Sequence, residues 1–462
     1  MYNVFAKRIF VVLFSVFSLS SFAQKTISIL PIGTSITYGI GSTDGSGYRK
    51  VLYEKLLMKQ LDVKMLGSVE SGKFLQPKCE GYPGKVITFL QDSVVPKTAS
   101  LKPDYILLEA GVNDMSFPVD PEHAPFRLSN LVDKISDAFP EAKILLATLT
   151  PIWTNRLLEY NKSLPGIVEL KRKQGMKLYL CDMYNAGIGI NEVPDAIHPN
   201  DAGYVKMANV WATAILSLES GDKKPSIPVD VAANAGPGQV ILRWNSSFQS
   251  QSYKIKRAMS ASGDFKEIAS VKAAYWFVDT SAKNNATYYY TISSYNEEGE
   301  SAPSSVVNTL PMENLGIAIN CGGHKSAGFL EDFGYEGGER ANWYWDKINL
   351  KNVAHPNGIF VFKTARQGRF TYKIQKLDPS KYYTLKLHFV EGTFSQPEKR
   401  VFDVEVNNIK KLANFDIFEK TRTKNLAHTE QFYLKPNAKG EFNIQFISQV
   451  GDPIVSGIEV GF

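Results

Sequence analysis

Apolar positions in residues 25–219 alternate between short, mainly apolar runs and longer segments with a helical period. The runs predict β-strands at 26–31, 63–67, 104–110, 143–150 and 177–181. The longer segments predict helices at 48–61, 124–139, 156–174 and 202–218. Because the third and fourth strands are apolar on both faces, we expect them at the centre of a parallel sheet. Repeated β–α units predict an α/β three-layer sandwich with its active site at the carboxyl ends of the strands.

The pattern changes after residue 219. Residues 220–228 are polar and contain two prolines, which is typical of a linker. Residues 229–311 and 315–462 then show short strands separated by turn residues, with no long helical period. We therefore expect two all-β sandwich domains after the α/β domain.

The first 24 residues have the pattern of a signal peptide. Lys7 and Arg8 precede an apolar run at 9–22, and Ala23 completes a small-residue cleavage site. The run is short for a transmembrane helix, and no other segment is apolar for long enough to span a bilayer. No cysteine follows the cleavage site. We expect an exported protein, periplasmic or extracellular, without a membrane anchor.

Charge and cysteine content narrow the classes of function. The chain has 52 Lys and Arg and 46 Asp and Glu, which gives a formal net charge of +6. This excess is small and the basic residues are scattered, which argues against nucleic-acid binding. Cys79, Cys181 and Cys321 are too few and too far apart for a disulfide framework or a metal site. We expect buried free thiols, with a Cys79–Cys181 disulfide as the alternative, and neither a metal nor an organic cofactor.

Four short motifs in the α/β domain hold groups suited to acyl transfer. Each follows a predicted strand or lies in a loop, and the four motifs contribute Ser35, then Gly84, then Asn113, and finally Asp195 with His198. Together they provide a hydroxyl, a base with a carboxylate partner, and hydrogen-bond donors for an oxyanion. Each residue alone has an ordinary explanation as a turn former, helix cap or surface side chain. Their combination at the strand ends favours catalysis.

The proton chemistry assigns the roles. A serine hydroxyl is a weak nucleophile until a base removes its proton, so Ser35 requires an imidazole. Residues 25–219 contain only His123, in a polar turn, and His198. Asp195 lies three residues before His198 and can orient its ring and stabilise the imidazolium. We therefore expect Ser35, Asp195 and His198 to be catalytic.

An oxyanion hole completes this arrangement. We expect its donors to be the backbone N–H of Ser35, the backbone N–H of Gly84 and the side-chain amide of Asn113. A glycine at position 84 allows the backbone to approach a substrate without a Cβ between them.

These blocks resemble those of the SGNH hydrolases, also called GDSL-type esterases, over about 190 residues. The resemblance implies a flavodoxin-like fold with the family's Ser, Gly, Asn and His on Ser35, Gly84, Asn113 and His198, and its aspartate on Asp195. Two positions complicate the comparison with the family's motifs. Gly81 competes for the glycine role, and Thr34 stands where the family usually has aspartate before the serine.

The two β domains also resemble known modules. Residues 229–311, with Trp244 in an early strand and Tyr288 in a later one, are similar to a fibronectin type III domain. We expect both rings to be core or corner residues.

The segment 315–462 resembles a malectin-type carbohydrate-binding domain in the motifs at 315–323, 387–394 and 451–460. That resemblance places Phe394 on a sugar-stacking aromatic and Asp452 on a ligand-contacting acid, while Thr393 replaces a tyrosine. The alternative is that Phe394 packs in the core and Asp452 shapes a turn.

These observations predict an exported serine esterase that removes acyl groups, acetyl in particular, from a polysaccharide or oligosaccharide through an acyl-enzyme. Two alternatives remain open. The first is a lipid or lysophospholipid esterase, and the second is a glycan-binding protein without catalytic activity.

Overall fold

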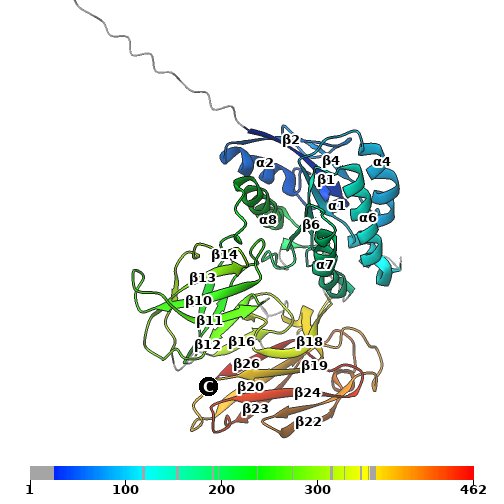
Figure 1. Ribbon diagram of the computed structural model, residues 1–462. Helices are drawn as coiled ribbons and strands as arrows, with labels where there is room; N and C mark the ends of the chain where they lie inside the picture. The colour runs from blue at the N-terminus through cyan, green and yellow to red at the C-terminus, as the bar shows by residue number, and fades with distance from the viewer. Residues whose placement is uncertain are drawn as a thin grey trace, which may run out of the picture.

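The computed structural model shows a chain of three successive globular units (Figure 1). It describes residues 25–116, 120–151, 156–189, 192–195, 197–236, 238–272, 274–312, 316–326, 328–343, 346–351, 353 and 361–461. The predicted signal peptide, residues 1–24, lies outside the described residues. The three units are called the first, second and third domains below.

The first domain is built on one twisted sheet with the order β3-β4-β1-β5-β6-β7, in which β2 pairs with the first half of β1. All pairings are parallel except β3 with β4. The strands are β1 (Lys25–Gly33), β2 (Leu61–Met65), β3 (Val69–Glu70), β4 (Lys78–Gly81), β5 (Tyr105–Glu109), β6 (Lys143–Ala147) and β7 (Leu178–Cys181).

Helices cover both faces of this sheet and make the predicted three layers (Figure 1). Helices α2 and α8 pack together on one face, while α4, α6 and α7 cover the other. The helices are α1 (Ser35–Tyr38), α2 (Tyr48–Met58), α3 (Ile87–Phe89), the π-helical η1 (Leu90–Val94), α4 (Val95–Thr98), α5 (Val112–Ser116), the 3₁₀ turn η2 (Pro121–His123), α6 (Ala124–Ala138), α7 (Arg156–Lys173) and α8 (Asp201–Ser220).

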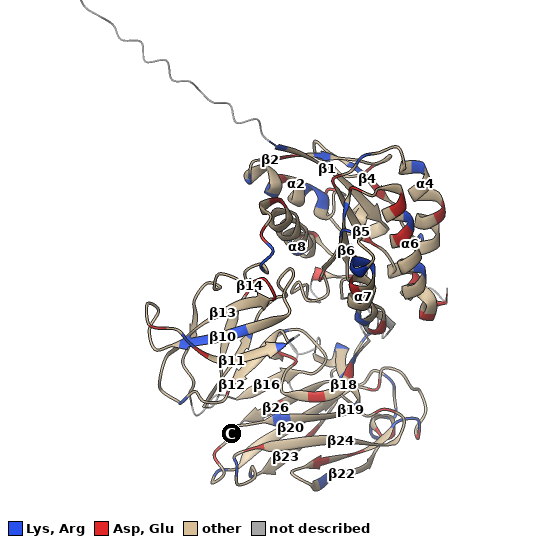
Figure 2. Ribbon diagram, viewed as in Figure 1, with Lys and Arg blue, Asp and Glu red and all other residues tan. Residues whose placement is uncertain are grey.

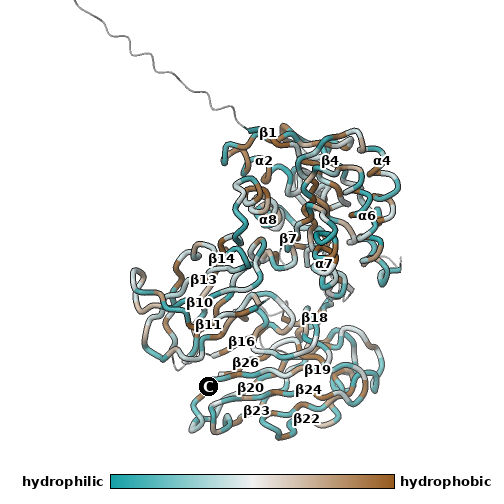
Figure 3. Tube along the Cα trace, viewed as in Figure 1, coloured by the Kyte–Doolittle hydropathy of each residue, from teal (hydrophilic) through white to brown (hydrophobic). Residues whose placement is uncertain are grey.

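The predicted fold class is confirmed, with two corrections of detail. The sheet is mixed rather than wholly parallel, because the short strands β3 and β4 form an antiparallel hairpin. The helical segment at 87–98 was not predicted, because η1 interrupts it with a π turn that breaks the regular period. The central strands were predicted correctly, since every residue of β5 is buried. Figure 3 shows the same strands as the most hydrophobic part of the domain.

The second domain has two β-sheets and no described helix. One sheet has the order β12-β9-β8, and the other has β11-β10-β13-β14 with β15 beside β13. Trp244 and Tyr288 are buried, as predicted, and the Tyr288 hydroxyl accepts a hydrogen bond of 2.9 Å from the Lys283 amide. The fibronectin type III resemblance stays a prediction. The strands are β8 (Ala232–Gly236), β9 (Gln239–Arg243), β10 (Ser252–Ala258), β11 (Lys266–Lys272), β12 (Trp276–Asp279), β13 (Tyr288–Asn296), β14 (Gly299–Glu300) and β15 (Val307–Thr309).

The third domain packs two larger sheets over an aromatic core that includes Phe389, Phe402 and Phe415. The sheet orders are β17-β16-β26-β20-β23 and β18-β19-β24-β21-β22, and β25 pairs with β19. Its elements are β16 (Ile317–Asn320), β17 (Leu330–Glu331), β18 (Tyr335–Asn342), η5 (Val361–Lys363), β19 (Thr364–Ile374), β20 (Tyr383–Phe389), β21 (Val401–Val406), β22 (Ile409–Phe415), α9 (Ile417–Thr421), β23 (His428–Leu434), β24 (Phe442–Val450), β25 (Ile454–Val455) and β26 (Gly457–Gly461).

Charges of both signs are interspersed over all three domains (Figure 2). Cys79, Cys181 and Cys321 are buried free thiols, as predicted, and the alternative Cys79–Cys181 disulfide is not formed. Among the described residues, no helix has the length and apolar character needed to cross a bilayer.

Candidate active site

Ser35, His198 and Asp195 form a continuous chain of hydrogen bonds at the carboxyl edge of the first sheet. Ser35 opens α1 immediately after β1, and its Oγ lies 2.8 Å from His198 Nε2. The other ring nitrogen, Nδ1, lies 2.6 Å from Asp195 Oδ2. This is the geometry in which an imidazole accepts the serine proton while a carboxylate fixes the ring and its tautomer.

The Asp195 carboxylate is itself held by the backbone. Its Oδ1 accepts from the amide of Ile197 at 3.0 Å and from the amide of His198 at 2.7 Å. Burial acts to raise the pKa of Asp195, but the hydrogen bonds from the His198 amide and imidazole outweigh it and hold the pKa below its ordinary value. The carboxylate is therefore ionised at neutral pH, as an orienting partner must be.

Two glycines allow the backbone to bring these side chains together. A Cβ at Gly33 would collide with the Thr37 hydroxyl, so only glycine lets α1 turn directly over the end of β1. Gly41 has φ +95°, and a Cβ there would collide with the Pro199 carbonyl and lie 3.0 Å from the Cβ of His198. Gly41 therefore lets the loop that carries His198 approach the loop after α1.

The two predicted oxyanion donors beyond Ser35 lie in loops that follow neighbouring strands. Gly84 follows β4 and Asn113 lies in α5 after β5, so both occupy the same edge of the sheet as Ser35. The Asn113 amide donates one hydrogen bond of 2.7 Å to the Lys85 carbonyl, which joins the two loops. An NH₂ group has a second hydrogen that can face a substrate.

The structure separates the two candidate glycines. A Cβ at Gly81 would lie 2.6 Å from the Tyr38 amide, so this glycine serves the close packing of β4 against α1. Gly84 has φ +74°, and a Cβ there would have no neighbour within 4 Å. The space beside Gly84 is therefore open to a substrate, which favours it over Gly81 for the oxyanion hole.

Asp114 supports this loop and was missed by the sequence analysis. It is fully buried, and its Oδ2 accepts from the Ile87 amide at 3.0 Å while Oδ1 pairs with Arg127 at 2.9 Å. The carboxylate thereby ties the start of α3 to α5, which carries Asn113. Its place directly after Asn113 was the available signal, but the sequence does not reveal its partners.

Two buried polar side chains without hydrogen-bond partners lie close to the nucleophile among the described residues. Thr34 and Glu109 are fully buried, and among the described residues neither the Thr34 hydroxyl nor either Glu109 carboxyl oxygen has a hydrogen-bond partner. Glu109 ends β5 in register with Gly33, next to Thr34. Burial raises the pKa of Glu109 to about 8, so this carboxyl is largely neutral at pH 7.

His123 takes no part in this arrangement. It is exposed, and its Nδ1 lies 2.8 Å from Asp120 Oδ1 in a surface turn, in agreement with the sequence analysis. Among the described residues, no cluster of His, Cys, Asp and Glu is arranged to hold a metal ion.

In the third domain, Phe394 and Asp452 meet at one arginine. The Arg400 guanidinium lies 5.1 Å from the centre of the Phe394 ring and donates to the Asp452 carbonyl oxygen. Glu391 fixes Arg400 from the other side at 2.8 Å and accepts from the amides of Thr393 and Phe394. Phe394 is half-buried and Asp452 exposed, so the two predicted ligand residues lie close together on a partly open surface around Arg400.

The α/β sheet with a serine, imidazole and carboxylate in contact at its carboxyl edge is suited to acyl transfer through a serine nucleophile. Comparison with known families identifies the domains. Residues 32–206 match the GDSL-like Lipase/Acylhydrolase family, and residues 315–458 match the Malectin domain. The chain therefore combines a GDSL-like acylhydrolase domain with a malectin domain.

Several known proteins are similar to parts of the chain. A putative endoglucanase X of Acetivibrio thermocellus is 29% identical over 154 residues, which are 30% of this chain and 67% of that protein. A multidomain esterase of Ruminococcus flavefaciens is 28% identical over 253 residues, which are 47% of this chain but only 32% of that protein. Among solved structures, a family 3 carbohydrate esterase of Clostridium thermocellum is 29% identical and covers 43% of this chain and 98% of its own, with a TM-score of 0.40.

Proposed function

We propose that the protein is an exported serine esterase that removes acetyl groups from carbohydrate. The observation that carries the esterase part is the pair of contacts at 2.8 and 2.6 Å that links Ser35, His198 and Asp195. A malectin domain on the same chain supports a carbohydrate substrate, and the similarity to a multidomain esterase supports ester hydrolysis. Export rests on the signal-peptide pattern of residues 1–24.

In the first half of the reaction, Ser35 Oγ attacks the ester carbonyl carbon as His198 Nε2 takes the hydroxyl proton. Asp195 stabilises the imidazolium that forms. The carbonyl oxygen becomes an oxyanion, which accepts hydrogen bonds from the Ser35 amide, the Gly84 amide and the second N–H of Asn113. Each such donor contributes roughly 3 kcal/mol to lowering the barrier. Collapse of this intermediate breaks the ester bond, and His198 gives its proton to the departing sugar oxygen, which leaves as a hydroxyl.

In the second half, water replaces the sugar. His198 Nε2 accepts a proton from the water as its oxygen attacks the acetyl carbonyl bound to Ser35. The same donors stabilise the second oxyanion. Collapse releases acetate, and the proton on His198 returns to Ser35 Oγ.

We also propose that the malectin domain holds the polysaccharide through Phe394 and Asp452. A half-buried ring can stack on the apolar face of a sugar, and an exposed carboxylate can accept from its hydroxyls. Arg400 fixes both residues, because it contacts the ring of one and the backbone of the other.

Acetate release from acetylated xylan, followed for the full chain and for Ser35→Ala, tests the proposal. We expect release by the parent protein and a loss of at least about 10³-fold in the variant. Equal rates in the two proteins would exclude Ser35 as the nucleophile. A series of nitrophenyl esters distinguishes the lipid-esterase alternative, since that enzyme prefers long acyl chains and the proposed one prefers acetyl.

A further inference from the structure

The loop that carries Asp195 and His198 is held from outside its own domain. It runs through residues 182–200, between β7 and α8, and the second domain binds its first part. The Tyr275 hydroxyl donates to Asp182 Oδ2 at 3.1 Å, and the Asn245 side-chain amide donates to the Ala186 carbonyl at 3.2 Å.

The third domain reaches the same part of the loop. From β18, Arg340 Nη1 donates to the Tyr184 hydroxyl at 3.2 Å, and its guanidinium lies 5.6 Å from the centre of that ring. Glu331 pairs with Arg340 at 3.6 Å and with Arg243 of the second domain at 3.2 Å. Arg340 and Glu331 therefore connect all three domains.

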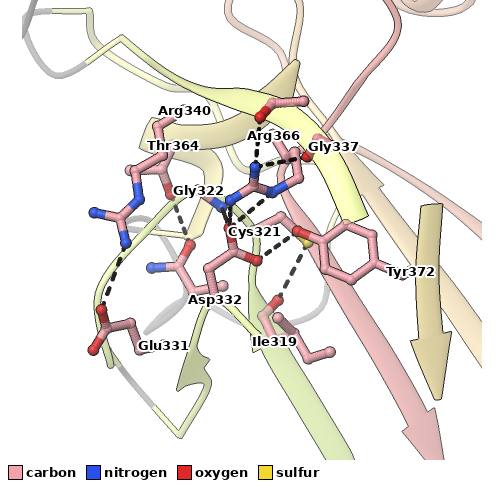
Figure 4. Close-up of polar contacts among 12 residues, drawn as sticks. Ile319, Cys321, Gly322, Glu331, Asp332, Gly337, Arg340, Thr364, Arg366 and Tyr372 are labelled. Carbon is pink, nitrogen blue, oxygen red and sulfur yellow. Dashed lines mark hydrogen bonds and ion pairs between the residues drawn. The ribbon is translucent and has the colours of Figure 1, made fainter. Parts of the chain in front are cut away.

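A network of polar contacts around Asp332 and Arg366 forms the base of this connection, as Figure 4 shows. Next to Glu331, the fully buried Asp332 accepts from Arg366 at 2.6 and 3.0 Å, from the Tyr372 hydroxyl at 2.5 Å and from the Gly322 amide at 2.8 Å. A buried carboxylate whose charge and lone pairs are satisfied in this way stiffens its surroundings, here the segment directly after β17. Arg366 also donates to the Gly337 carbonyl at 3.1 Å, which ties this network to β18. Arg340 thus projects from a fixed part of the third domain toward the loop.

A continuous set of contacts leads from the held part of the loop to the imidazole. Lys206 Nζ, on α8, donates to the Gly187 carbonyl at 2.6 Å and pairs with Glu192 at 2.7 Å. The Glu192 carbonyl accepts from the Asn200 amide at 2.7 Å. Asn200 caps α8 two residues after His198. The position of residues 182–187 therefore influences the orientation of the His198 imidazole.

We propose that Tyr275, Asn245 and Arg340 are positioning residues for the esterase reaction. They act through the loop, which they hold so that His198 Nε2 stays within hydrogen-bond distance of Ser35. This inference rests on the proposed function. Small displacements of a catalytic base cost large factors in rate, so loosening the loop lowers kcat without changing the substrate contacts. The two β domains are then part of the catalytic unit as well as binding modules.

The test uses the full chain with single substitutions and their matched controls. Tyr275→Phe removes one hydroxyl from the loop contact, and Arg340→Ala removes the guanidinium. Exposed Tyr295→Phe and exposed Arg369→Ala make the same chemical changes in the same two domains away from the loop. The substrate is nitrophenyl acetate, which is too small to need the malectin domain. Titration with a fluorophosphonate counts the functional serines, so that kcat is expressed per active site.

We expect kcat per active site to fall by about tenfold in each loop variant, with KM within twofold of the parent and both controls unchanged. An unchanged kcat per active site in the loop variants would overturn the inference. This holds even if the fluorophosphonate titrates fewer functional serines, because that result would mean that the residues serve folding alone. A fall in KM and kcat together in the controls would also overturn it. Ser35→Ala in the same assay tests the proposed function separately, since its activity must vanish whatever the loop variants do.

Discussion

The buried carboxyl of Glu109 makes the stability of the first domain depend on pH. Its pKa is raised from 4.5 to about 8 by burial. Below pH 4.5 the carboxyl is protonated in both the folded and the unfolded state, so its burial does not lower the free energy of unfolding. Between pH 4.5 and 8 only the unfolded state ionises, so stability falls as the pH rises. At 1.36 kcal/mol for each pH unit, the loss is about 3 kcal/mol at pH 7 and on the order of 5 kcal/mol above pH 8.

Glu109→Gln removes this titration while keeping the shape of the side chain. A buried amide without a partner has its own cost, but that cost does not vary with pH. Three tyrosines interact electrostatically with Glu109 and remain in both proteins: Tyr48 from α2, Tyr160 from α7 and Tyr204 from α8. The difference in unfolding free energy between variant and parent therefore isolates the carboxyl.

Scanning calorimetry of both proteins between pH 4 and 9 measures that difference. We expect the unfolding free energy of the variant, relative to that of the parent, to rise by about 3 kcal/mol between pH 4 and 7. Each kcal/mol corresponds to a shift of about 2–4 °C in the melting temperature of the first domain. Parallel melting curves across the whole range would refute the reasoning, because they would mean that Glu109 ionises alike in the folded and unfolded protein.

Three further predictions concern the reaction itself. Asp195→Asn should lower kcat on the order of 10³-fold with little change in melting temperature, since it removes the charge that orients His198; steady-state kinetics and calorimetry check both parts. Asn113→Ala should lower kcat by about 10²-fold or more while KM changes little, as measured on nitrophenyl acetate, because one oxyanion donor is lost. Gly41→Ala should abolish most activity, since its Cβ collides with the Pro199 carbonyl; normal acetate release by this variant would show that the loop has other ways to approach.

The sequence was sufficient to predict which three side chains, Ser35, Asp195 and His198, come into contact, because the chemistry of acyl transfer leaves few alternatives. Only two histidines lie in residues 25–219. Each follows an aspartate by three residues, and the polar turn around His123 left His198 as the candidate base. The fold class followed from the apolar runs, of which β5 is the clearest. Glu109 illustrates the limit, because it ends that same run and its burial depends on helices far away in the chain. Arg340 and Tyr184 are 156 positions apart, and no local pattern indicates their contact.

Mass spectrometry of the protein quenched in acid during turnover of an acetylated xylo-oligosaccharide tests the central claim directly. We expect a mass increase of one acetyl group on the peptide that contains Ser35, which disappears in Ser35→Ala and decays when substrate is exhausted. An active protein that carries no acetyl group at any time, or carries it on another residue, would contradict the assignment of Ser35 as the nucleophile.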